Sequence, residues 1–364
     1  MIQMKNTCIL RAVSLLLLLS VWTGAFAQNY TDARDLTLFG KAFKTAHPYD
    51  RMDPVEGMSK GEKSQAQLCA GLAVAFRTNS PKIGVRVVFR EQAGNGGNNG
   101  PIAARGFDLY IKKDGRWLWA WNAYPKNTAE IPHEVQLLEN GGSSEKDCLL
   151  YLPLSSKIES LEVITDEGSW IEAASRPFRK KIVVWGSSYT AGSGAGRCAM
   201  TWEAQLSRAT GYDFMNYGFS GNCKLQAYFA EELVKADADA YVLDAFSNPS
   251  ADMIRERLEP FIKIMTESRP GVPLIFVRTI YREKRNFSET YDAREHAKRQ
   301  AAEEMMQEMV KKYPDVYWVN TTNATSEEHE ATSDGSHPDS YGYTLWMQSV
   351  KEPVMEILSK YEKN

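Results

Sequence analysis

The chain has 364 residues and a formal net charge of −3 at pH 7. This length favours two domains over one. A mildly acidic chain without a basic stripe is a poor nucleic-acid binder, so we expect no nucleic-acid partner.

Residues 1–27 have the pattern of a secretory leader. Lys5 and Arg11 precede a short apolar run, and an A-x-A cleavage site ends at Ala27. The run is too short for a permanent anchor, and no later segment is long and apolar enough to cross a bilayer. We therefore expect an exported protein, periplasmic or extracellular, that begins at Gln28, has no integral membrane span and carries a charge near −5.

Residues 28–174 have the pattern of an all-β sandwich. Short runs rich in β-branched and aromatic residues alternate with turn clusters, such as the Gly/Asn run at 94–100. Regular spacing of this kind is typical of two packed antiparallel sheets. The predicted strands are 83–90, 106–112, 116–121, 148–154 and 161–165.

Three tryptophans alternate along one predicted strand. Trp117, Trp119 and Trp121 would share one face of the sheet because successive side chains point to opposite sides. The pattern favours packing in the core. An aromatic platform for a sugar ring is the alternative.

Residues 175–180 contain a proline and several basic residues and are the predicted linker. From 181 to 364 the pattern changes to alternating strands and helices, which predicts a parallel sheet with helices on both faces. The predicted strands are 182–185, 213–217, 240–243, 274–278 and 316–320, and the helices are 202–210, 225–234, 253–268, 291–312 and 344–360.

Ser188 follows the first strand of this second domain. A buried parallel strand that ends in Gly186 would place Ser188 at the carboxyl edge of the sheet, where ligands bind in open α/β sheets. This position suits a nucleophile whose own N–H helps to hold an oxyanion. Taken alone, the same serine fits a helix N-cap equally well.

Three further polar segments follow later strands or precede the last helix. They contain Gly221, Asn248 and the pair Asp334 and His337. Together with Ser188 they supply a nucleophile, a glycine N–H, an amide side chain and an Asp/His pair. Those are the groups that an acyl-transfer site requires.

Four cysteines remain after removal of the leader. Cys198 and Cys223 lie in neighbouring predicted loops, and export would permit a disulfide between them. Two buried thiols are at least as consistent with the sequence. The cysteine spacing fits no zinc site, so we expect no metal.

The four segments resemble the SGNH, or GDSL-type, hydrolase superfamily, because they occur in its order. Residues 106–110 read GFDLY, which resembles the branch with an N-terminal GxDLY domain. The resemblance implies a flavodoxin-like α/β hydrolase domain behind the β-sandwich. Three positions depart from the pattern. Ser187 replaces the familiar Asp before the nucleophile, and the familiar Gly-x-Asn-Asp block has Phe246 in place of Gly and Pro249 in place of the final Asp.

The resemblance also implies a role for each residue. Ser188 would attack an acyl carbonyl, His337 would act as general base and Asp334 would orient the imidazole. The N–H groups of Ser188 and Gly221 and the side chain of Asn248 would form the oxyanion hole.

The sequence therefore predicts an exported serine esterase that acts on small acyl esters, with acetylated carbohydrates as the favoured substrates and with no cofactor. An acyltransferase with the same acyl-enzyme is the nearest alternative. A glycan-binding protein with an inactive hydrolase domain is the alternative from another class.

Overall fold

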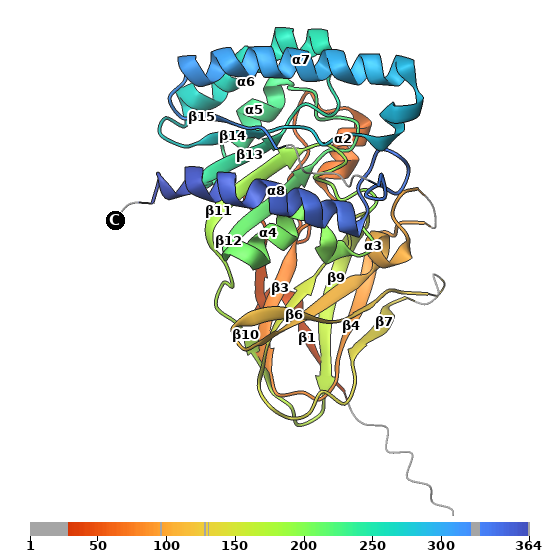
Figure 1. The fold of residues 1–364 in the computed structure, drawn as a ribbon. Helices are drawn as coiled ribbons and strands as arrows, with labels where there is room; N and C mark the ends of the chain where they lie inside the picture. The colour runs from red at the N-terminus through yellow and green to blue at the C-terminus, as the bar shows by residue number, and fades with distance from the viewer. Residues whose placement is uncertain (1–27, 95–96, 127–128, 130, 322–327, 363–364) are drawn as a thin grey trace, which may run out of the picture.

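The computed structural model describes residues 28–94, 97–126, 129, 131–321 and 328–362. The predicted leader, 1–27, lies outside the described residues. Figure 1 shows two antiparallel sheets at one end of the molecule and a parallel sheet between helices at the other. No helix in the described ranges is both long and apolar enough to span a bilayer.

The N-terminal region is a β-sandwich, as predicted. One sheet has the strand order β1-β9-β4-β7, and the other has the order β10-β3-β8-β5-β6 with β2 paired to β3. The elements are β1 (Gln28–Asp32), η1 (Ala33–Asp35), β2 (Thr37–Phe39), α2 (Lys60–Ala66), β3 (Ala73–Thr78), β4 (Ile83–Glu91), α3 (Pro101–Arg105), β5 (Phe107–Lys113), β6 (Arg116–Ala123), β7 (His133–Leu138), β8 (Lys146–Tyr151), β9 (Lys157–Asp166) and β10 (Ile171–Ala173).

The second region is a five-stranded parallel sheet in the order β12-β11-β13-β14-β15. This is the flavodoxin-like order, with the switch point beside the first strand, and it confirms the predicted fold class. The elements are β11 (Arg179–Gly186), η2 (Cys198–Met200), α4 (Trp202–Thr210), β12 (Tyr212–Gly218), α5 (Ala227–Leu233), β13 (Ala240–Asp244), α6 (Ala251–Ser268), β14 (Leu274–Val277), η3 (Glu283–Phe287), α7 (Glu289–Lys312), β15 (Val316–Val319) and α8 (Ser340–Ser359).

Alternation along β11 divides the helices between two faces. Ile182 and Val184 pack with α4 and α8, whereas Val183 and Trp185 pack with α5, α6 and α7. Because successive side chains of a strand point to opposite sides, a run of apolar residues fills both layers of the hydrolase region.

The two regions share a hydrophobic core. In β3, Val74 and Phe76 face the interior of the sandwich, whereas Ala73 and Ala75 join the cluster that contains Trp202 and other residues of α4 and α8. Strands β5 and β8 alternate in the same way. The middle sheet is therefore buried on both faces, and the sandwich packs directly on the hydrolase region.

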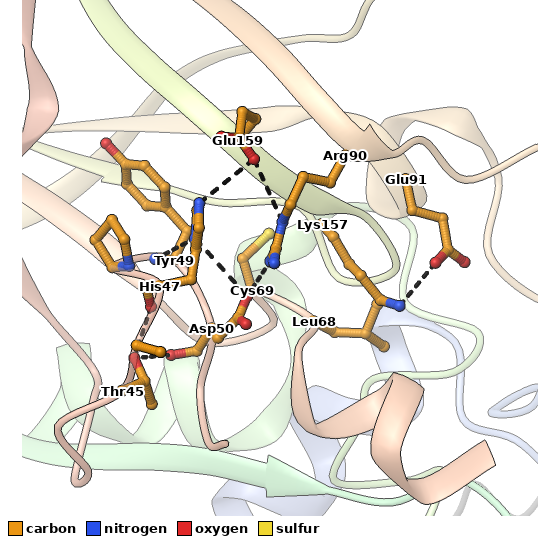
Figure 2. Close-up of polar contacts among 12 residues, drawn as sticks. Thr45, His47, Tyr49, Asp50, Leu68, Cys69, Arg90, Glu91, Lys157 and Glu159 are labelled. Atoms are coloured by element: carbon orange, nitrogen blue, oxygen red, sulfur yellow. Dashed lines mark hydrogen bonds and ion pairs between the residues drawn. The ribbon is translucent and has the colours of Figure 1, made fainter. Parts of the chain in front are cut away.

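The segment between β2 and β3, which includes α2, crosses to the hydrolase region. Figure 2 shows its Asp50 paired with Arg90 of β4 and its His47 facing Glu159 of β9. His47 Nε2 lies 3.6 Å from Glu159 Oε2. The next residue, Arg51, points the other way and donates to Asn216 Oδ1 at 2.8 Å and to the Gly218 carbonyl at 3.2 Å. Two consecutive residues thus fix this segment to both regions.

The GxDLY motif also joins the two regions. Asp108 Oδ2 accepts hydrogen bonds from the Ala199 N–H at 2.8 Å and from Arg197 Nη1 at 3.1 Å. The Tyr110 hydroxyl accepts from the same Arg197 nitrogen at 2.8 Å. The Asp and Tyr of the motif therefore hold the chain just before α4.

The tryptophan strand corrects one prediction. Trp119 and Trp121 are 43% and 57% exposed and stack on one another with ring centroids 6.0 Å apart, so core packing is wrong for both. Trp117 is partly buried against the shared core. The cause is the position of β6, which is the last strand of its sheet and is bulged between its pairings with Leu109 and Tyr110.

Candidate active site

The nucleophile candidate lies directly beyond the central strand β11. Gly186 ends this strand so close to its neighbours that a Cβ atom would lie 2.1 Å from Thr190 Oγ1. The Ser187 hydroxyl then donates to Asp244 Oδ2 at 2.7 Å, and the Ser187 N–H reaches the same oxygen at 3.1 Å. These contacts fix the turn that presents Ser188 at the carboxyl edge of the sheet.

Ser187 has a physical reason to differ from the familiar Asp. Burial raises the pKa of Asp244, and hydrogen bonds from Ser187, Ser247 and Thr190 oppose that rise. A second carboxylate at position 187 would face Asp244 in a buried site, where like charges repel strongly. Asp244, at the end of β13, therefore accepts hydrogen bonds from Ser187 and does not face a second carboxylate.

Ser188, His337 and Asp334 form one chain of hydrogen bonds. Ser188 Oγ lies 3.0 Å from His337 Nε2, and His337 Nδ1 lies 2.8 Å from Asp334 Oδ2. Asp334 Oδ1 accepts from the backbone N–H groups of Ser336 at 2.9 Å and His337 at 2.7 Å. Burial alone would raise the pKa of Asp334, but these hydrogen bonds and the histidine hold it below its ordinary value.

The predicted oxyanion donors lie in the same cleft as Ser188. Gly221 has a left-handed backbone (φ +73°), which a glycine adopts without strain. Asn248 Oδ1 accepts from the Cys223 N–H at 3.3 Å, and this contact orients the amide. The Asn248 nitrogen has no protein partner in the described ranges, so it is free to donate to a bound oxyanion.

Asn98 is a site residue that the sequence interpretation missed. It comes from the Gly/Asn loop of the sandwich, and its Nδ2 lies 3.0 Å from Asp334 Oδ2 and 2.8 Å from His337 Nδ1. The neighbouring Asn99 anchors the loop, because its Oδ1 accepts from the Gly194 N–H at 2.7 Å. In the sequence, the Gly/Asn composition of this loop indicated only a turn, and it did not indicate which residues Asn98 would contact.

The cysteine pair is not bonded. Cys198 Sγ lies 3.6 Å from the Tyr151 carbonyl, and Cys223 Sγ lies 3.5 Å from the Asp244 carbonyl. Both are free, buried thiols with pKa values raised by burial. The disulfide alternative is therefore wrong, and the alternative of two buried thiols is the one that the structure shows. The two thiols help to pack the loops around the site.

The cleft lined by Ser188, His337, Gly221, Asn248 and Asn98 has a volume of about 940 Å³. Within the described ranges, no group of three His, Cys, Asp or Glu side chains is arranged to hold a metal ion. The arrangement supplies a hydroxyl paired with an imidazole, an oriented carboxylate and nearby amide donors, which together can carry out acyl transfer.

Comparison with known proteins extends over most of the chain. Residues 179–356 match the GDSL-like lipase/acylhydrolase family, and residues 28–171 match the GxDLY family, described as the N-terminus of an SGNH-hydrolase-type esterase. A crystal structure of a protein described as a GDSL-like lipase from Bacteroides ovatus is 34% identical, with a TM-score of 0.87, and the match covers 92% of this chain and 98% of that one.

Two more distant structures share the fold. A salicylyl acyltransferase from a tetracycline biosynthetic pathway is 18% identical, with a TM-score of 0.72 and coverage of 91% of this chain and 97% of that one. A family two carbohydrate esterase from Cellvibrio japonicus is 11% identical, with a TM-score of 0.56 and coverage of 92% and 99%. None of the curated proteins compared with the chain is significantly similar to it.

Proposed function

Since the chain belongs to the GDSL-like lipase/acylhydrolase family and is a serine ester hydrolase, we propose that Ser188 is its nucleophile. The observation that carries this proposal is the chain of hydrogen bonds from Ser188 Oγ through His337 to Asp334, at 3.0 and 2.8 Å. Such spacing is within reach of proton transfer from the serine to the imidazole.

The mechanism follows from the positions of these groups. His337 Nε2 takes the Ser188 proton as the oxygen attacks the acyl carbonyl, and the N–H groups of Ser188 and Gly221 and the Asn248 amide receive the oxyanion. His337 then gives its proton to the leaving alkoxide. Water repeats the two steps on the acyl-enzyme and releases the acid. Asp334 stabilises the imidazolium throughout.

The proposed substrates are small acyl esters, with acetyl groups on carbohydrates as the favoured class. The exposed, stacked rings of Trp119 and Trp121 support this choice, since flat apolar surfaces of this kind suit sugar rings. Arg197 lies 4.8 Å from the Trp119 ring centroid and holds that ring in place.

Export is part of the proposal. Residues 1–27 have the pattern of a leader, and Gln28, the expected first residue of the mature chain, is also the first residue of β1, where it pairs with Asp166 of β9. Cleavage after Ala27 would therefore leave the sheet intact. We propose a periplasmic or extracellular location.

Labelling with a fluorophosphonate tests the nucleophile assignment. We expect one modified serine, Ser188, and a Ser188→Ala variant that loses at least about 10⁴-fold of the rate on an aryl acetate, because the covalent step disappears. Its thermal unfolding midpoint should match that of the wild type. The control is Ser220→Ala, a change in the same cleft that should keep the label. A label on another serine would overturn the assignment.

A further inference from the structure

The cleft around Ser188 is basic although the chain is acidic. Five lysines and arginines line it against one acid, Asp252, which gives the lining residues a net charge of +4 with His337 counted as neutral, whereas the whole chain carries −3. A cleft lined by charge of one sign raises the local concentration of ligands with the opposite sign. The lining basic residues are Lys224, Arg282, Lys284, Arg294 and Lys298.

The inner wall of the cleft holds part of this charge in fixed positions. Arg282 Nη1 and Lys298 Nζ each lie 3.0 Å from Glu295 Oε1. Both cations also donate to the Ser247 carbonyl, at 2.9 and 2.8 Å. One carboxylate thus faces two largely buried cations, and within the described ranges neither cation has a second carboxylate partner.

Two more cations of the cleft lining lie against the ring of Tyr291. Lys284 Nζ lies 4.4 Å and the Arg294 guanidinium 4.8 Å from the centroid of its ring. Arg294 Nε approaches Glu295 at 3.6 Å, a carboxylate already shared with two other cations. Within the described ranges, the Lys284 ammonium has no carboxylate partner. Two cations are therefore held against one tyrosine ring in the lining of the cleft, where a ligand can reach them.

These cations lie on the His337 side of the site. The backbone N–H of Lys284 donates to the Gly335 carbonyl at 2.9 Å. The Tyr291 hydroxyl lies 3.3 Å from the Oγ atom of Ser336, the residue before His337. His337 returns its proton to the leaving alcohol. Groups beside His337 therefore face the alcohol part of the ester.

We propose that the natural substrate is an ester whose alcohol part carries an anionic group, such as a carboxylate, and that Lys284 and Arg294 bind this group. The inference deepens the proposed ester hydrolysis and rests on it. Lys224, which follows the Gly221 loop, and the Arg282 and Lys298 wall attract the same anion at longer range.

A matched pair of esters tests the inference. Acetate release from 4-acetoxybenzoate, which is anionic, is compared with release from 4-acetoxybenzamide, which is neutral and similar in size. The readout is the ratio of the two kcat/KM values, divided by the ratio of the hydroxide-catalysed rates. This quotient does not depend on the fraction of a variant that folds.

For the wild type we expect a corrected ratio of roughly 10 at low ionic strength. It should fall several-fold in about 0.5 M NaCl, where screening is strong. The double variant Lys284→Gln, Arg294→Gln should bring the ratio close to one. Lys113→Gln, an exposed lysine of β5 that removes a positive charge outside the cleft, should keep the wild-type ratio.

The outcomes separate the inference from the proposed function. If both esters are hydrolysed and Ser188 is labelled, but the corrected ratio is near one or is unchanged in the double variant, the anionic substrate is ruled out and the esterase proposal stands. If neither ester is hydrolysed and Ser188 is not labelled, the proposed function itself is overturned.

Discussion

Two polar clusters join the sandwich to the hydrolase region, and each is built around an asparagine. In the first, Arg51 of the sandwich donates to Asn216, whose amide also donates to the Glu203 carboxylate, and all three residues are fully buried or nearly so. In the second, Asn98 of the sandwich reaches Asp334 and His337, whose side chains are 36% and 24% exposed.

The difference between the clusters is one of burial. A buried charge that loses its partners incurs the full desolvation penalty, so the Arg51 cluster should set the stability of the chain. An exposed donor can exchange its partner for water at little cost. The Asn98 cluster should therefore act on the rate of reaction and scarcely on folding.

Arg51→Met should give the largest effect. It leaves the carbonyls of Leu68, Gln65 and Gly218 without their donor, and we expect a loss of about 3–5 kcal/mol in the free energy of unfolding, measured with urea. Arg255→Met, which breaks exposed ion pairs of α6 with Asp252 and with Glu304 of α7, should cost less than about 1 kcal/mol. Equal losses in the free energy of unfolding for the two variants would show that the buried cluster stabilises the fold no more than the exposed ion pairs do.

Glu203→Gln should change how the free energy of unfolding depends on pH, which tests the role of burial in the Arg51 cluster. Burial raises the pKa of Glu203 to about 7 in the folded protein, above its value in the unfolded chain, so ionisation opposes folding. The wild type should therefore lose a few kcal/mol through this group as pH rises from about 4.5 to about 7. The glutamine variant should lack that loss in urea unfolding at pH 5 to 8. The exposed change Glu231→Gln should keep the wild-type dependence.

Asn98→Ala should give the smallest effect of the three changes. The effect should appear as a lower kcat and not as a lower free energy of unfolding. Loss of the donor to Asp334 weakens the orientation of His337, and we expect kcat on an aryl acetate to fall roughly 10-fold, or about 1.4 kcal/mol in barrier. The unfolding midpoint should be unchanged. Asn98→Asp should be slower still, because it places a second carboxylate beside Asp334. A change in KM alone would contradict the positioning role.

The hydrolase fold was predictable because its signals are local. Strands β11, β13, β14 and β15 each contain a short apolar run, and helix 202–210 was predicted with the bounds that α4 has. In the sandwich, β3 went unrecognised because it begins Ala-Val-Ala-Phe, and apolar residues buried on both faces give no alternation. For Trp119 and Trp121 the sequence favoured core packing over the exposed alternative, since nothing local shows that β6 is an edge strand.

The candidate site was predictable where one region supplies it. The structure brings together Ser188, Asp334 and His337, all of which follow strands or precede a helix in the hydrolase region. Asn98 and Arg51 could not be assigned, because each belongs to the sandwich while its partners in these clusters belong to the hydrolase region. Contacts of this kind depend on how two regions dock, which no local pattern records.

The middle sheet of the molecule, with apolar residues on both faces, has a consequence for inheritance. A gene rearrangement that separated residues 28–171 from 179–356 would uncover Tyr110, Leu149 and Tyr151 on one product and the surfaces of α4 and α8 on the other. Large exposed apolar patches promote aggregation. The two matched segments are therefore expected to pass between genomes as one unit, and a new N-terminal partner would have to bring an equivalent apolar face with it.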